Sequence, residues 1–327
     1  MIRFGIIGTN WITEAFIEAA KEINEFKLTA VYSRNSETAA SFAEKHGAEH
    51  IFTNLEDFTS SEHMDAVYIA SPNSLHAQQA ISCMEAGKHV ICEKPLASNT
   101  QEVTAMIEAA KRHDVIFMEA MKTIYLPNFL AIKANLHKIG KVRKYIASYC
   151  QYSSRYDKFK EGTILNAFKP EFSNGALMDI GVYTIFPMVV LFGMPKKIQA
   201  TSYKLHTGVD GQGSIVFQYE EMDATVHYSK IANSHLPSEI QGENGSMIID
   251  KIHTPENVKI IYRNGMEEDI SVPQKSKSMY YEAKEFIHAI QKGSKKSDSL
   301  SHSLNTATIM EDVRKQTGII YPADNQK

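Results

Sequence analysis

The fold is decided near the start of the chain by the stretch Ile2-Arg3-Phe4-Gly5-Ile6-Ile7-Gly8-Thr9-Asn10-Trp11-Ile12-Thr13. The apolar run that ends at Gly8 predicts a buried strand, and the apolar spacing over 11–24 predicts a helix after it. In this position a tight turn lets a pyrophosphate approach N–H groups at the helix N-terminus. The usual three-glycine pattern is reduced to Gly8-x-Asn10-x-x-Thr13, but asparagine tolerates the backbone of such a turn. We therefore expect dinucleotide contacts from Gly8, Thr9, Asn10, Trp11 and Ile12. The alternatives are a turn without function and a packing role for Trp11.

Strands and helices alternate over the first third of the chain. Strands are predicted at 2–7, 28–33, 65–70, 89–93 and 115–118, and helices at 11–24, 37–46, 75–86 and 101–113. Ser36 and Thr100 are the expected N-caps of the second and fourth of these helices. This alternation predicts right-handed βαβ units and a parallel sheet covered on both faces.

The pattern changes after about residue 120. Alternating strands are predicted at 142–152, 198–205, 214–219, 224–228, 246–249 and 258–262, helices at 127–139, 175–192, 280–291 and 304–317, and a surface loop at 292–303. The fold class is therefore α/β. We expect a doubly wound Rossmann sheet in 1–120 and, in 121–327, an α+β domain on an open, mostly antiparallel sheet.

Composition excludes several functional classes. The 327 residues include 35 basic and 38 acidic residues, and this balance provides no basic surface for nucleic acid or for a membrane. Three cysteines are too few for a disulfide framework, so we expect a reducing, cytoplasmic location. The uncharged stretch 180–195 is shorter than a membrane span and is interpreted as a buried helix. His46 and His50 are interpreted as solvated side chains, and no metal site is predicted.

The end of the second strand indicates which dinucleotide binds. An NAD site usually has an acidic residue there, which binds the ribose 2′-hydroxyl. This chain has Ser33 and Arg34 instead, a hydroxyl and a guanidinium that suit a 2′-phosphate. We expect NADP, with NAD as a possibility. The alternative is that Arg34 is an ordinary surface residue.

Two further stretches carry a resemblance to a known family. They are Ser71-Pro72-Asn73-Ser74-Leu75-His76 after the third strand and Glu93-Lys94-Pro95-Leu96-Ala97 after the fourth. With the opening turn, they resemble the Gfo/Idh/MocA oxidoreductases over most of the chain. A third segment, 175–183, resembles the family's G-x-x-x-D-x-x-x-H, but with tyrosine in place of histidine. In this it is similar to the branch of dimeric dihydrodiol dehydrogenases and NADP-dependent xylose dehydrogenases.

The resemblance implies a nucleotide-dependent dehydrogenase or reductase and a role for each matching residue. Lys94 matches the active-site lysine, and Pro95 matches a proline that follows a cis bond and orients that lysine. Ser71, Pro72 and Asn73 match the loop under the cofactor, and Glu93 matches a residue near the nicotinamide. For His76, support of that loop is favoured over proton donation. The segment 119–123 is followed by no arginine-containing stretch, which is a further departure from the family.

Asp179 and Tyr183 are spaced i, i+4, so on a helix they share a face. Tyrosine has a pKa near 10, and a nearby ammonium lowers it. We therefore predict Tyr183 as proton donor and acceptor, Lys94 as its electrostatic partner, and Asp179 as the group that holds substrate hydroxyls or orients Lys94. Proton transfer by Lys94 itself is the alternative.

The expected substrate is a sugar, a sugar-derived ketone or a cyclic diol. A non-catalytic nucleotide sensor of the same fold is the alternative from another class, and transient oxidation without net redox change is a third. An open sheet exposes a broad face, and similar family members pair through it. We therefore expect a homodimer or a larger homo-oligomer.

Overall fold

The computed structural model describes residues 1–293 and 298–325, and the chain divides into two compact units. The first comprises Met1–Lys122 with Lys275–Ser303, and the second Thr123–Gln274 with Leu304–Lys327. The division near residue 120 was predicted, but 275–303 had been placed with the second domain. That segment joins the first unit because α9 (Tyr280–Lys292) packs against α1 (Trp11–Ala20), with the Phe286 and Phe4 rings 6.0 Å apart.

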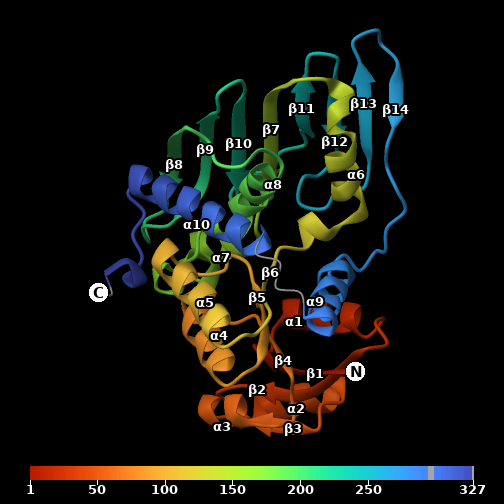
Figure 1. Cartoon of the computed structure of the whole chain (residues 1–327). Coiled ribbons are helices and arrows are strands. Elements are labelled where there is room, and N and C mark those ends of the chain that lie inside the picture. Colours follow the sequence, from red (N-terminus) through yellow and green to blue (C-terminus); the bar gives the residue numbers. More distant parts are fainter. Residues whose placement is uncertain (294–297, 326–327) are drawn as a thin grey trace. The chain divides into compact units, whose positions relative to one another are not determined.

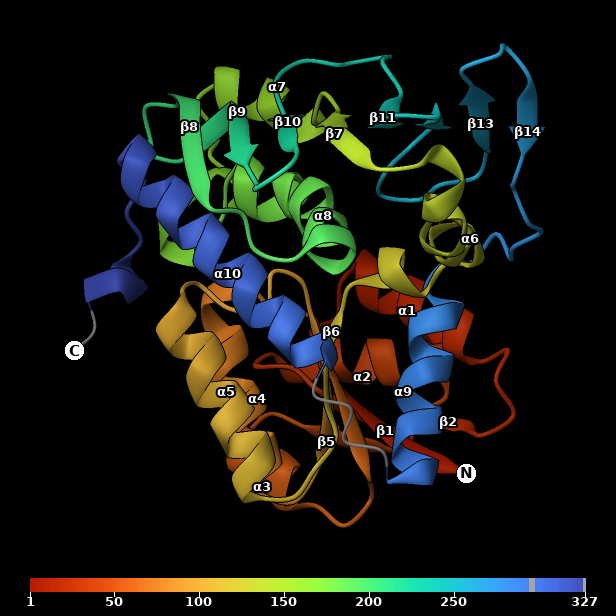
Figure 2. The same ribbon diagram turned by 45° about the horizontal axis from the view of Figure 1, so that its top comes forward.

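The first unit is built on a six-stranded parallel sheet in the order β3-β2-β1-β4-β5-β6. Helices α1 and α9 lie on one side of the sheet and α4 and α5 on the other (Figures 1 and 2). The strands are β1 (Ile2–Ile7), β2 (Phe26–Tyr32), β3 (His50–Phe52), β4 (Ala66–Ile69), β5 (His89–Glu93) and β6 (Phe117–Ala120). The further helices are α2 (Ser36–His46), α3 (Leu55–Ser60), α4 (His76–Glu85) and α5 (Thr100–Arg112). This confirms the doubly wound fold, while β3 and α3 were not predicted.

Two predicted helix caps are wrong by one residue. Asn35 caps α2 and Asn99 caps α5, whereas Ser36 and Thr100 lie inside the first turns. In each helix the asparagine side chain accepts a hydrogen bond from the third helical N–H, because its oxygen reaches that group from one position earlier.

The second unit is built on an eight-stranded sheet in the order β14-β13-β12-β11-β7-β10-β9-β8, which runs from right to left in Figure 1. Neighbouring strands are antiparallel except β10 and β7, which are parallel. The strands are β7 (Val142–Cys150), β8 (Lys197–Lys204), β9 (Asp210–Gln218), β10 (Asp223–Ser229), β11 (Ser238–Gly242), β12 (Gly245–Ile249), β13 (Val258–Tyr262) and β14 (Glu267–Asp269). The helices are α6 (Pro127–Asn135), α7 (Ser154–Lys160) and α8 (Val182–Phe192), with α10 (Asp298–Thr317) divided between the units. The mostly antiparallel sheet was predicted, but β11, β14 and α7 were not.

Burial alternates along β7, β9 and β10. Ile215, Phe217, Ala224 and Val226 are fully buried on the face where α8 packs on β7 and β10, whereas Val216 between them is 45% exposed. This is the period-two pattern of a sheet with one covered face.

The apolar stretch before Gly193 forms a π-helical turn, Leu177–Gly181, that continues into α8, close to the predicted helix at 175–192. Among the described residues, Pro170–Phe192 is long and apolar enough to cross a membrane, but 72% of its most apolar window is buried within the protein. This fits the predicted buried helix. The predicted loop at 292–303 is wrong where it is described: residue 292 ends α9 and 298–303 belong to α10, while 294–297 lie outside the described residues.

Candidate functional site

The predicted dinucleotide turn lies between β1 and α1, and its geometry requires glycine at its first position. Gly8 has a φ of +104°, and a Cβ atom there would lie 2.6 Å from the carbonyl oxygen of Ala70. Asn10 closes the turn: its amide nitrogen donates to that carbonyl at 2.7 Å, and its oxygen accepts from the N–H groups of Ile12 and Thr13. Both N–H groups are therefore already hydrogen-bonded to Asn10, so a pyrophosphate would instead contact the preceding residues of the turn.

Of the other predicted cofactor residues at this edge, Trp11 and Arg34 are exposed and Ser33 is half-buried. The Trp11 side chain is 67% exposed, so it is not part of the packed core of the first unit. Arg34 is exposed just beyond the end of β2, next to the Asn35 cap of α2. Ser33, which lies between the end of β2 and Arg34, is half-buried, and its N–H donates to the Phe52 carbonyl at 3.1 Å.

His76 links the two segments that carry the family resemblance. Its ring is buried, with Nε2 2.9 Å from the carbonyl oxygen of Ser71 and Nδ1 3.1 Å from that of Pro95. The Lys94–Pro95 bond is cis. Burial lowers the pKa of His76, which favours the neutral imidazole with one N–H to donate. The ring therefore contacts the loop at the Ser71 carbonyl, and support of the loop stays a prediction.

Glu93 is fixed by contacts inside the first unit. It is buried, and its carboxylate accepts hydrogen bonds from the Tyr68 hydroxyl at 2.7 Å and from the Lys94 N–H at 3.2 Å. Tyr68 in turn stacks on Phe16, with ring centroids 3.8 Å apart. Burial raises the pKa of Glu93. Tyr68 was not predicted, because a tyrosine inside an apolar strand carries no motif.

Two more buried carboxyl groups and a half-buried lysine lie near the carboxyl ends of β5 and β6. Burial raises the pKa of Glu119 to about 7 and that of Glu282 well above its ordinary value. Neither carboxyl oxygen of Glu282 has a hydrogen-bond partner among the described residues. Burial lowers the pKa of Lys122, while Glu282 and Glu93 oppose that shift. In open α/β sheets this end of the strands is where ligands bind.

The second unit positions Asp179 and Tyr183. Asp179 lies in a π-helical turn, Leu177–Gly181, and Tyr183 is the second residue of α8. Such turns occur often at functional sites. The Asp179 carboxylate forms an ion pair with Lys230, whose side chain is almost completely buried. Lys230 was not predicted, since an isolated lysine after a strand gives no signal.

Aromatic rings surround Tyr183. Tyr149 and His253 stack on each other, with centroids 3.9 Å apart and planes 4° apart, and both meet the Tyr183 ring edge-on at 5.8 and 6.2 Å. Burial, helped by the charge of Asp179, raises the pKa of Tyr149 to about 12. Tyr149 is thus a neighbour of both Asp179 and Tyr183.

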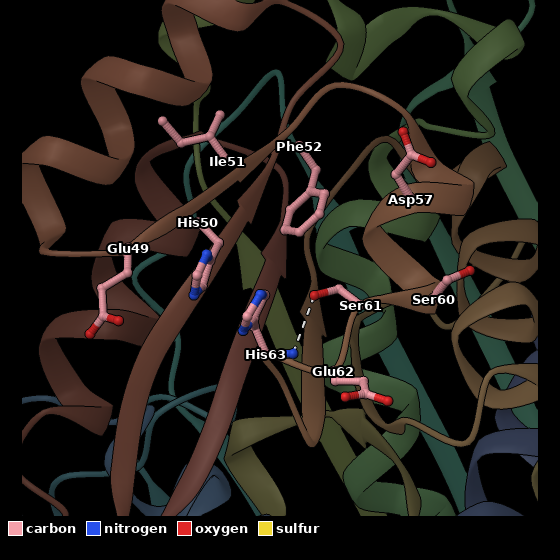
Figure 3. A pocket seen from close by; sticks show the side chains of 9 residues that line it. All are labelled: Glu49, His50, Ile51, Phe52, Asp57, Ser60, Ser61, Glu62 and His63. Atoms are coloured by element: carbon pink, nitrogen blue, oxygen red, sulfur yellow. Dashed lines mark hydrogen bonds between the residues drawn. The ribbon is translucent and has the colours of Figure 1, made fainter.

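A cavity in the first unit contains none of the predicted site residues (Figure 3). It lies along β3 and α3, where the rings of His50 and His63 stack with centroids 3.6 Å apart. Its lining residues are Glu49, His50, Ile51, Phe52, Asp57, Ser60, Ser61, Glu62 and His63. The predicted solvation of His46 is wrong, because its side chain is buried against Phe42.

Comparisons with known proteins cover almost the whole chain. The profile of the oxidoreductase family with an NAD-binding Rossmann fold, GFO_IDH_MocA, matches residues 2–121, and that of the GFO/IDH/MocA C-terminal domain matches 133–248. The scyllo-inositol 2-dehydrogenase (NADP(+)) IolU of Bacillus subtilis is 56% identical over 99% of both chains. A trans-1,2-dihydrobenzene-1,2-diol dehydrogenase of Danio rerio is 31% identical over 99% of both. The crystal structure of KijD10, a 3-ketoreductase from Actinomadura kijaniata in complex with NADP and TDP-benzene, matches 97% of this chain and 98% of its own with a TM-score of 0.87; at 23% identity it shows the shared fold.

Proposed function

Because the chain belongs to the Gfo/Idh/MocA oxidoreductase family, we propose that it is an NADP-dependent dehydrogenase that interconverts a hydroxyl group of a cyclic polyol or sugar with the corresponding ketone. The observation that carries this proposal is the arrangement of side chains around Asp179 and Tyr183 in the second unit. There a carboxylate with a buried counter-charge lies near a tyrosine ringed by aromatic side chains. The Bacillus subtilis relative favours an inositol as the substrate.

The residues of the first unit fit a dinucleotide. Gly8 leaves no room for a side chain at the turn, the helix N-terminus follows directly, and Trp11 and Arg34 are exposed at this edge. We propose that Thr9, Asn10 and Trp11, with Ile12 alongside, contact the cofactor, together with the loop Ser71-Pro72-Asn73 and Glu93. Ser33 and Arg34 would bind the 2′-phosphate. When bound, the nicotinamide supplies or accepts the hydride.

The protein's own groups must move the hydroxyl proton. We propose Tyr183 as the proton donor and acceptor, Lys94 as the cation that stabilises its phenolate, and Asp179 as the acceptor for substrate hydroxyls. The high pKa of Tyr149 makes it a poor second candidate for the base, because it stays protonated at neutral pH. Proton transfer by Lys94, with Tyr183 only positioning the substrate, is the competing assignment.

We further propose that the chain forms a homodimer or larger homo-oligomer through the open face of its eight-stranded sheet, and that it works in the cytoplasm. Gln199, Val216, Thr225 and Ile146 lie side by side across this face, on four neighbouring strands. The exposure of Val216 within this row supports the proposal.

The test is a fluorescence titration with NADPH and NADH, followed by turnover with scyllo-inositol, other inositols, aldoses and cyclic diols. We expect tighter NADPH binding and turnover of at least one cyclic polyol. Tyr183→Phe should abolish turnover but leave NADPH binding intact, whereas the matched control Tyr203→Phe, on an exposed tyrosine of β8, should keep both. Binding without turnover across the panel would instead indicate a non-catalytic nucleotide sensor. Full turnover by Tyr183→Phe would assign the proton to Lys94.

A further inference from the structure

We infer that Lys230 is a positioning residue for the substrate: it holds the Asp179 carboxylate in the orientation that accepts hydrogen bonds from substrate hydroxyls. This inference deepens the proposed function and rests on it. Lys230 and Asp179 both belong to the second unit.

The backbone of Lys230 is fixed at the end of two parallel strands. β10 pairs with β7 up to Ser229 and Cys150, and Lys230 follows directly. The Lys230 N–H donates to the Gly211 carbonyl at 2.8 Å, and its carbonyl accepts from the Ser153 N–H at 2.9 Å. Because the N–H and the carbonyl of Lys230 are both hydrogen-bonded, the backbone position from which its side chain extends is fixed.

The ammonium group of Lys230 lies in a closed environment. Its side chain is 4% exposed, and Nζ lies 5.6 Å from the centre of the Phe168 ring. Removing a charge from water is costly unless a counter-charge compensates it, so Lys230 requires a carboxylate. The pair with Asp179 provides one.

A second carboxylate, Asp210, lies close enough for Lys230 to influence it, but it serves another purpose. Asp210 is fully buried, and its Oδ2 accepts from the Leu177 N–H at 2.8 Å, at the start of the π-helical turn. Burial raises the pKa of Asp210 to about 6. Asp210 therefore holds the turn that carries Asp179, while Lys230 holds the Asp179 side chain itself.

The pair is asymmetric in its exposure. The Asp179 side chain is 32% exposed, against 4% for Lys230, so the ammonium lies behind a carboxylate that still reaches solvent. A carboxylate fixed from behind can accept hydrogen bonds from neighbouring hydroxyls without losing further side-chain freedom. Polyols present such hydroxyls.

The experiment uses steady-state kinetics of the full-length enzyme with scyllo-inositol, or whichever cyclic polyol the panel identifies, and NADP⁺. A hydrogen bond from the substrate to the charged Asp179 contributes binding free energy, and its loss should raise KM by about tenfold to a hundredfold. We expect this rise in Lys230→Met, with kcat changed by less than about threefold. Lys230→Arg should recover most of the affinity because it keeps the charge. Lys144→Met is the matched control, because Lys144 pairs with Asp223 across the same two strands, and it should leave KM unchanged.

The double variant separates positioning through Asp179 from a general structural role. If Lys230 acts through Asp179, adding Lys230→Met to Asp179→Asn should raise KM no more than about twofold beyond Asp179→Asn alone. This comparison also carries the test if Lys230→Met alone fails to fold, since the double variant removes both charges of the Lys230–Asp179 pair. An unchanged KM in folded Lys230→Met, or additive effects in the double variant, would overturn the inference alone. If the wild-type enzyme binds NADPH but turns over no polyol or sugar, the proposed function fails and this inference falls with it.

Discussion

Replacing Glu119 by glutamine should stabilise the first unit at pH 8 but hardly change it at pH 5. Glu119 is 5% exposed on β6, and burial is the main cause that raises its pKa to about 7. The negative charge of Glu93 raises this pKa further, while hydrogen bonds from Ser303 and the Leu96 N–H and the charge of Lys94 lower it. Glutamine keeps an oxygen for those two hydrogen bonds and cannot ionise.

The sign and the magnitude follow from proton linkage. A carboxyl group whose pKa is raised in the folded state does not reduce stability when the pH is below its unfolded pKa of 4.5. It reduces stability by the full amount when the pH is above its folded pKa of about 7. A rise of this size corresponds to about 3 kcal/mol of lost stability at pH 8. Wild-type protein should therefore lose this amount between pH 4.5 and 7, relative to Glu119→Gln.

Urea unfolding at pH 5 and pH 8 measures this difference. Any packing cost of the substitution is common to both pH values, so the pH-dependent part is the quantity to compare. Glu22→Gln is the control, because Lys275 and Lys277 hold the pKa of Glu22 below its ordinary value of 4.5; its contribution to stability is lost only below that pH, so its difference from wild type should be the same at pH 5 and pH 8. A stability difference between Glu119→Gln and wild type that is equal at the two pH values would refute the reasoning.

Three further substitutions test other parts of the structure. Gly8→Ala should weaken NADPH binding more than tenfold, because its Cβ meets the Ala70 carbonyl and its φ is strained for alanine; calorimetric titration measures this, and unchanged affinity would contradict the turn geometry. Arg34→Ala should reduce the preference for NADPH over NADH by about tenfold or more, mainly through weaker NADPH binding; an equal loss for both nucleotides would place the guanidinium away from the 2′-phosphate. Val216→Asp should convert the oligomer to a monomer in light scattering, because it puts a charge on the open sheet face, on strand β9, and a persistent oligomer would move the interface elsewhere.

The sequence predicted those features that are local. β1, β5 and β13 have the predicted bounds, because short apolar runs between turn residues identify them. β3 was missed because a half-exposed three-residue edge strand has too few residues to show a period. Glu93, Lys94, Asp179 and Tyr183 were predicted as site residues from segments that resemble a family.

The remaining site residues depend on pairing between distant segments. Lys230 reaches Asp179, 51 residues earlier, because β10 lies parallel to β7 in the sheet. Tyr68 contacts Glu93 because β4 and β5 are neighbours. No local pattern carries such information, since it arises from strand order and register. The buried Glu282, brought to the first unit by α9, is a further case.

The asparagine in the nucleotide turn has a thermodynamic consequence. A glycine-rich turn is flexible before its ligand arrives, and ordering it on binding costs entropy. Here the Asn10 side chain already joins the first N–H groups of α1 to the end of β4. A loop ordered in advance gives up less conformational freedom when it closes on a phosphate. The substitution that weakens the sequence motif therefore lets the free protein hold its turn in a binding-ready form.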